Sequence, residues 1–182
     1  MRAIVILSLS ALSALPALAE PAEEIGILNP EEMTIARILD DVARGETSMM
    51  HCAAGYGITK KGDHDRARSV FEACARAGWT GAMTWMAQLD DNGLGTPEED
   101  PARAADWDRM AAEAGDPVGQ FNYGLDLMRG RGVPQDPVAG RALVDRAAAA
   151  GLPVAQRLRA AGYDLDTVTP DADDWKYEKR LY

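Results

Sequence analysis

The residues best suited to covalent or acid–base chemistry are two cysteines, Cys52 and Cys74, and two histidines, His51 and His64. A cysteine nucleophile needs a base within hydrogen-bond reach, and His51 directly precedes Cys52. Adjacent residues on a helix point about 100° apart, so these two side chains do not face each other. A Cys52 held in a disulfide would also be unable to act as a nucleophile. We therefore expect no catalytic residue and no enzyme activity.

Two glycine pairs, Gly93 with Gly95 and Gly130 with Gly132, have a composition that phosphate-binding loops share. A Walker loop continues with Gly-Lys-Ser/Thr into a helix, and a dinucleotide-binding loop follows a strand. Neither context is present, because each pair lies between two helical patterns and precedes an Asp-Pro pair. We predict that both glycine pairs are turns.

Metal, cofactor and nucleic-acid binding are not indicated. No pair of His or Cys has the spacing of zinc ligands. The acidic run Asp171–Asp174 lacks the glycine and the spacing of a calcium loop. The formal charge is −10, from 19 Lys and Arg against 29 Asp and Glu. This balance argues against nucleic-acid binding, which needs clustered basic charge.

The N-terminal segment has the pattern of a secretory signal. Arg2 gives a basic start, Ala3–Leu15 is apolar, and Ala17-Leu18-Ala19 is a small-x-small cleavage site. The apolar run is short for a membrane span, although an anchor that stays attached is the alternative. We predict a signal peptide over residues 1–19, a mature protein in the periplasm or outside the cell, and no stable membrane insertion after cleavage.

Such a compartment is oxidising, and the chain has two cysteines. A disulfide between Cys52 and Cys74 is therefore expected. It would close a loop of about 22 residues and stabilise the fold by roughly 3 kcal/mol. The alternative is two buried free thiols.

The elements that carry these residues repeat along the chain. Three glycines recur at spacings of 37 and 36 residues, and an aspartate precedes each of them by 15 residues. The glycines are Gly78, Gly115 and Gly151, and the aspartates are Asp63, Asp100 and Asp136. The second and third aspartates precede proline, which predicts a capped helix start, and each glycine predicts a helix end.

Each unit is therefore predicted to be a helix pair. Apolar residues at helical spacing place the first helix of the second unit at about 81–92 and that of the third at about 117–129. Before them, the sequence predicts a helix over about 48–59 and a capping helix over about 30–44, ended by Gly45.

The second and third units resemble Sel-one-like repeats, which are relatives of the tetratricopeptide repeat. The second unit matches this pattern at Ala87, Gly93, Gly95, Asp100, Ala104, Trp107, Ala111, Ala112 and Gly115. The third unit matches it at Gly124, Gly130, Gly132, Val133, Asp136, Gly140, Leu143, Ala147, Ala148 and Gly151. The first unit has no Gly-x-Gly loop and is similar to a plain tetratricopeptide unit. The resemblance implies an all-α fold, an α-α superhelix or solenoid.

The predicted organisation follows from this resemblance. Residues 1–19 are the signal peptide and residues 20–46 an N-terminal segment with the capping helix. Residues 47–163 hold about three repeats and a partial fourth helix, in which Ala160 and Tyr163 fit the pattern. Residues 164–182 form an acidic-aromatic tail, which either covers the last repeat or binds a partner.

The resemblance also implies an adaptor or regulatory role, with another envelope protein or a peptide as the partner. Such solenoids bind along the groove formed by their first helices, where we expect Trp85, Gln88, Asn122 and Asp126. In the tail, Trp175 and Tyr177 are further candidates, because aromatic residues dominate interaction hot spots.

Two other functions stay open. One is a secreted hydrolase like the cysteine-rich β-lactamase-like branch of the family, although that branch has a cysteine pair in every repeat. The other is a structural spacer in an envelope complex.

Overall fold

In the computed structural model, the described part of the chain runs from residue 34 to residue 168 and contains helices but no strand. The elements are α1 (Ile35–Ala43), α2 (Met49–Lys60), α3 (His64–Arg76), α4 (Thr80–Asp91), α5 (Pro101–Glu113), α6 (Pro117–Arg129), α7 (Pro137–Ala149), α8 (Pro153–Ala160) and the short 3₁₀ helix η2 (Leu165–Val168). The predicted signal peptide and the tail residues Trp175 and Tyr177 lie outside the described residues.

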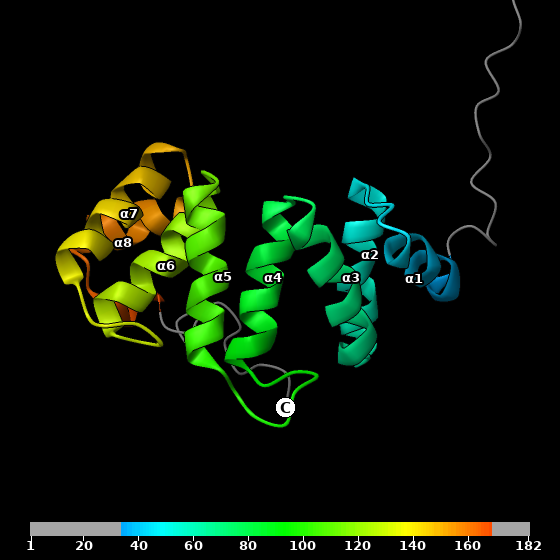
Figure 1. Ribbon diagram of the computed structural model, residues 1–182. Helices are drawn as coiled ribbons and strands as arrows, with labels where there is room; N and C mark the ends of the chain where they lie inside the picture. The colour runs from blue at the N-terminus through cyan, green and yellow to red at the C-terminus, as the bar shows by residue number, and fades with distance from the viewer. Residues whose placement is uncertain (1–33, 169–182) are drawn as a thin grey trace, which may run out of the picture.

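Consecutive helices pack in pairs, and the pairs follow one another in a row. Figure 1 shows this row running from α1 at one end to α7 and α8 at the other. The pairs are α2 with α3, α4 with α5, and α6 with α7. Their arrangement confirms the predicted all-α solenoid.

Aspartate and glycine set the helix boundaries, as the sequence predicts. The carboxylates of Asp100 and Asp136 accept hydrogen bonds from backbone N–H groups in the first turns of α5 and α7, and a proline follows each. A cap of this kind contributes about 1 kcal/mol. Gly115 and Gly151 follow these helices with φ of 88° and 94°, which an L side chain rarely adopts.

Two predicted boundaries were wrong. The helix α1 begins at Ile35 rather than near residue 30, because the Thr34 backbone is extended and its hydroxyl accepts from Arg37 N at 3.2 Å. At the other end, α8 ends at Ala160. The left-handed Gly162 follows it, so Tyr163 lies beyond the helix and its hydroxyl donates to Asp145 Oδ1 at 2.7 Å.

Small residues allow successive helices to approach closely. A Cβ placed on Gly119 of α6 would lie 2.4 Å from the Cβ of Ala111 in α5. A Cβ on Gly124 of α6 would lie 2.9 Å from the carbonyl oxygen of Gly140 in α7. A larger side chain at either position would separate the helices, so these residues fix the stacking.

The Gly-x-Gly segments are turns, as predicted, and each contacts the preceding helix pair. Gly130 and Gly132 have φ of 72° and 69°. A Cβ on Gly132 would lie only 2.0 Å from the carbonyl oxygen of Pro101, the first residue of α5. Similarly, a Cβ on Gly95 would lie 2.9 Å from Arg68 Cδ in α3.

A fully buried carboxylate joins three helices in the core. Asp90 of α4 accepts from Arg103 Nε at 2.9 Å, from Arg103 Nη2 at 2.7 Å and from Trp107 Nε1 at 3.1 Å, all from α5. Arg68 of α3 forms a further ion pair with it. Charge-assisted hydrogen bonds of this kind are stronger than neutral ones. Asp90 therefore fixes the position of α4, the helix that carries the predicted binding residue Gln88.

The cysteines form the predicted disulfide. Cys52 of α2 and Cys74 of α3 are joined, with a Cα–Cα distance of 5.8 Å and a sequence separation of 22. No free cysteine is present among the described residues. The first helix pair is therefore covalently closed.

Candidate functional site

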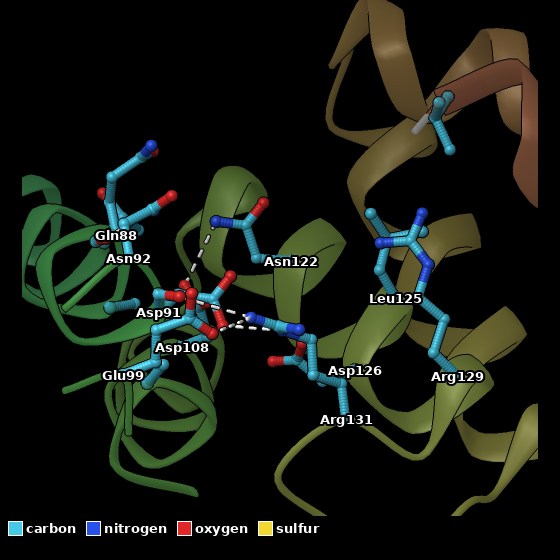
Figure 2. A pocket seen from close by; sticks show the side chains of 14 residues that line it. Gln88, Asp91, Asn92, Glu99, Asp108, Asn122, Leu125, Asp126, Arg129 and Arg131 are labelled. Carbon is cyan, nitrogen blue, oxygen red and sulfur yellow. Dashed lines mark hydrogen bonds and ion pairs between the residues drawn. The ribbon is translucent and has the colours of Figure 1, made fainter. Parts of the chain in front are cut away.

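A groove of about 720 Å³ lies between α4 and α6 (Figure 2). Its base includes Ala104 and Asp108 of α5, which are 4% and 7% exposed. Val168 of η2 also lines it. The groove therefore belongs to the first helices of the second and third units, with the second helix of the second unit beneath them.

Three of the four predicted groove residues line this space. Gln88 lies on α4, and Asn122 and Asp126 lie on α6. Trp85 does not line it. The Trp85 ring stacks on Phe71 with a centroid distance of 5.6 Å and contacts Tyr56 at 5.2 Å, so it packs towards the preceding helix pair.

The spacing along the helices explains why these side chains share one face. On α6 the lining residues are separated by three or four positions, which places them on the same side of a helix. They are Asn122, Leu125, Asp126 and Arg129. Gln88, Asp91 and Asn92 have the same relation on α4.

An ion pair crosses between the second and third units. Arg131 Nε, from the turn after α6, donates to Asp91 Oδ1 of α4 at 2.7 Å. Its Nη2 donates to the Asp91 carbonyl oxygen at 3.3 Å and lies 3.8 Å from Glu99. The Arg131 guanidinium is thus paired with the acidic side chains of Asp91 and Glu99 in the preceding unit.

Asp108 is the most deeply buried carboxyl group of the groove. Burial raises the pKa of Asp108 from 3.8 to about 8, because the charged form loses its hydration. Asn122 Nδ2 donates to Asp108 Oδ1 at 3.1 Å and acts in the opposite direction on this pKa. The nearby carboxylates of Asp126, Asp91 and Asp116 raise it further.

Asp126 has a similar environment. Burial raises the pKa of Asp126 to about 7, and the charge of Asp91 adds to this effect. Arg131 and Arg129 oppose it but form no ion pair with Asp126 among the described residues. Two carboxyl groups that exchange protons near neutral pH in one groove mark a candidate functional site. They can accept hydrogen bonds and bind a cationic group.

Sequence reasoning missed Asp108, Asp91 and Arg131 as groove residues. Asp108 lies four residues after the small residue Ala104 and three before Ala111, both of which are buried. This spacing was the available signal that Asp108 faces inwards. Arg131 is the middle residue of a Gly-x-Gly turn, and no local pattern indicates its partner 40 residues upstream.

The candidate nucleophile and its neighbour do not form a catalytic pair. Cys52 is in the disulfide, and His51 Nδ1 lies 3.1 Å from Ser48 Oγ, while its Nε2 lies 3.4 Å from Asp41 Oδ2. Within residues 34–168 no group of three or more His, Cys, Asp or Glu side chains is arranged to hold a metal ion. None of the helices in that range has the length and apolar character to cross a bilayer.

A comparison with models of protein families identifies the type of repeat that the two units beside the groove form. The family model of the Sel1 repeat matches residues 80–116 and 117–152, which contain α4 with α5 and α6 with α7. Residues 80–152 of the chain therefore form two Sel1 repeats. The Sel1 repeats correspond to the Sel-one-like units predicted from the sequence, and the groove lies between the first helices of both.

Solved structures of Sel1-repeat proteins have the same fold. One is the crystal structure of c5321, a protective antigen present in uropathogenic Escherichia coli strains that displays an SLR fold. It is 26% identical, with a TM-score of 0.60 over 73% of this chain and 28% of that one. A Sel1 repeat protein from Oxalobacter formigenes is 19% identical, with a TM-score of 0.61 over 79% of this chain and 59% of that one.

The similarity covers 28% and 59% of these two neighbours, so this chain spans only part of the length of each. Among proteins with curated descriptions, none is similar enough to count as a match.

Proposed function

We propose that this protein is an exported interaction module that binds another protein or a peptide of the cell envelope in the groove between α4 and α6. Sel1 repeats form protein-interaction scaffolds that are typically non-catalytic. The observation that carries the assignment to this surface is the groove itself. It lies between the two Sel1 repeats and is lined by polar side chains from both.

Export is supported by two features of the chain. The first 19 residues have the order of a cleavable signal, with Arg2, an apolar run and Ala17-Leu18-Ala19. The disulfide between Cys52 and Cys74 is typical of proteins that fold in an oxidising compartment. Fractionation of the native host, with N-terminal sequencing of the purified chain, tests this part. A chain in the envelope fraction that begins at Glu20 is the expected result.

Site-specific crosslinking tests the interaction surface. A photoreactive amino acid at Gln88 places the probe in the groove, and the same amino acid at Val138 of α7 is the matched control. Val138 is 81% exposed and does not line the groove. After irradiation of living cells, we expect a distinct adduct from the Gln88 probe and none from the Val138 probe. The crosslinked partner is identified by mass spectrometry, and its binding to the purified chain supports the proposal. Identical adducts from both positions, or none from Gln88, would contradict it.

A further inference from the structure

We infer that the groove binds a segment of its partner that carries a lysine or arginine, with the cationic group held between the carboxyl groups of Asp108 and Asp126. This inference rests on the proposed function and adds the chemical class of the ligand. Figure 2 shows Asp108 joined to the Asn122 amide and Asp126 beside Arg131, in the space between α4 and α6.

Carboxyl groups outnumber guanidinium groups in the lining of the groove, although Arg129 Nη2 is itself buried without a hydrogen-bond partner. The lining contains four carboxyl groups and two guanidinium groups. The carboxyl groups belong to Asp91, Glu99, Asp108 and Asp126, and the guanidinium groups to Arg129 and Arg131. Arg131 is paired with Asp91 at 2.7 Å. Neither Asp108 nor Asp126 forms an ion pair with any described residue, so a ligand cation would stabilise the ionised form of both carboxyl groups.

Burial makes Asp108 the strongest part of this argument. Its side chain is 7% exposed and accepts one hydrogen bond, at 3.1 Å from the Asn122 amide. A buried carboxylate is costly unless a cation and further donors neutralise it. A lysine ammonium has three donors and an arginine guanidinium has five, so either could satisfy the free lone pairs. A neutral or anionic side chain would not favour ionisation of Asp108.

The groove also has room and polar groups for the surrounding peptide. A volume of about 720 Å³ is within the range of sites that enclose a drug-sized ligand. The exposed Gln88 on α4 offers an amide donor and acceptor that match a peptide backbone. A second copy of this chain is disfavoured as the occupant, because each copy has a formal charge of −10.

Proton release is the consequence that separates this site from general surface attraction. Asp108 and Asp126 are partly protonated near neutral pH, with pKa values of about 8 and about 7. A cation bound between them lowers both pKa values and expels protons. Binding should therefore strengthen as the pH rises from about 6 to about 9. The other charged groups that face these two are Asp91 on α4, Asp116 at the start of α6, and Arg129 and Arg131.

Fluorescence anisotropy with a synthetic peptide tests the inference on the full chain. The probe is a fluorescein-labelled 12-residue peptide, (Ala-Lys-Ala-Gly)₃, and its matched control has acetyl-lysine at each lysine. We expect saturable binding of the lysine peptide and at least tenfold weaker binding of the acetylated one. Asp108→Asn and Asp126→Asn should each weaken lysine-peptide binding at least tenfold. Asp106→Asn changes the same charge on an exposed part of α5 outside the groove, so it should have little effect.

Calorimetry gives the second measurement. At pH 7, binding enthalpies in phosphate and Tris buffers should differ for the wild type, because protons are released. The difference should be smaller for Asp126→Asn, measured at a higher protein concentration, because only Asp108 can then release a proton. Circular dichroism of each variant confirms that it is folded.

Four outcomes would overturn the inference. They are equal binding of the acetylated peptide, equal weakening by Asp106→Asn, absence of proton release, and binding only after removal of residues 169–182, which would make the chain's own tail the occupant. If lysine peptides fail while Gln88 still crosslinks a partner, the ligand class is wrong and the proposed function stands.

Discussion

Replacement of Asp108 by Asn should change how the stability of the protein depends on pH. Asn has nearly the same shape and keeps an oxygen that can accept from Asn122, as Asp108 does at 3.1 Å. It removes only the ionisation. In the wild type, the pKa of Asp108 is about 8 in the folded state and near the ordinary 3.8 in the unfolded chain.

The sign and size of the effect follow from these two values. Below pH 3.8 the carboxyl group is protonated in both states, so its burial has no ionic cost. Between pH 3.8 and about 8 only the unfolded chain ionises, and each pH unit lowers the unfolding free energy by about 1.4 kcal/mol. From pH 4 to pH 7 the wild type should lose about 4 kcal/mol through this group. The loss ends above pH 8, where both states are ionised.

Urea unfolding followed by circular dichroism measures the effect at intervals from pH 4 to pH 9. The stability of Asp108→Asn relative to the wild type should increase by about 4 kcal/mol between pH 4 and pH 7 and then level off. Asp126 titrates in both proteins and cancels in the comparison. Asp106→Asn, which removes an exposed carboxyl group, should show no such trend. Parallel stability curves for Asp108→Asn and the wild type would refute a protonated, buried Asp108.

Three further changes test the fold that holds the groove. Asp90→Ala leaves the arginines around this buried carboxylate unpaired and should cost about 3–5 kcal/mol in urea unfolding, while a cost below 1 kcal/mol would contradict the role given to Asp90. Replacing Cys52 and Cys74 by Ser should lower the unfolding free energy by about 3 kcal/mol, and an unchanged urea midpoint would mean that the disulfide adds no stability. Gly132→Ala should cost at least about 2 kcal/mol, because the new Cβ meets Pro101 O and φ is positive. Gly57→Ala is its control, because nothing lies within 4 Å of the added Cβ. Alanine at this helical position should stabilise the protein by about 0.5–1 kcal/mol. Equal effects of the two changes would contradict the close contact between Gly132 and Pro101.

The helix pairs could be predicted from the sequence because their signals are local. Asp before Pro starts a helix, and Gly after an alanine-rich run ends it, within one or two turns of chain. The prediction failed where such signals competed. Asn29-Pro30 has the composition of a helix start, but the Thr34 hydroxyl caps the helix five residues later.

The candidate site could be predicted only in part, because it depends on contacts between distant residues. Gln88 and Asn122 followed from their places on the first helices of repeats. The pairing of Arg131 with Asp91 spans 40 residues, and the burial of Asp108 depends on how closely α4 and α6 approach it. Trp85 was assigned to the groove for its aromatic character, yet its ring packs against Phe71. Side-chain chemistry alone does not distinguish these two environments.

The Gly-x-Gly turns give the stack of repeats a direction. Gly95 is seated against Arg68 of the unit before it, and Gly132 against Pro101 of the unit before it. Each of the two turns thus packs against a surface of the helix pair that precedes it in the chain. The α2–α3 pair is the one without a Gly-x-Gly turn, and among the described residues it precedes both turns. Removing whole units from the C-terminal side leaves a contact surface uncovered on the remaining chain. Removing the α2–α3 pair instead leaves the turn at Gly95 without its contact to Arg68. Truncations from the two ends of the solenoid therefore remove different contacts.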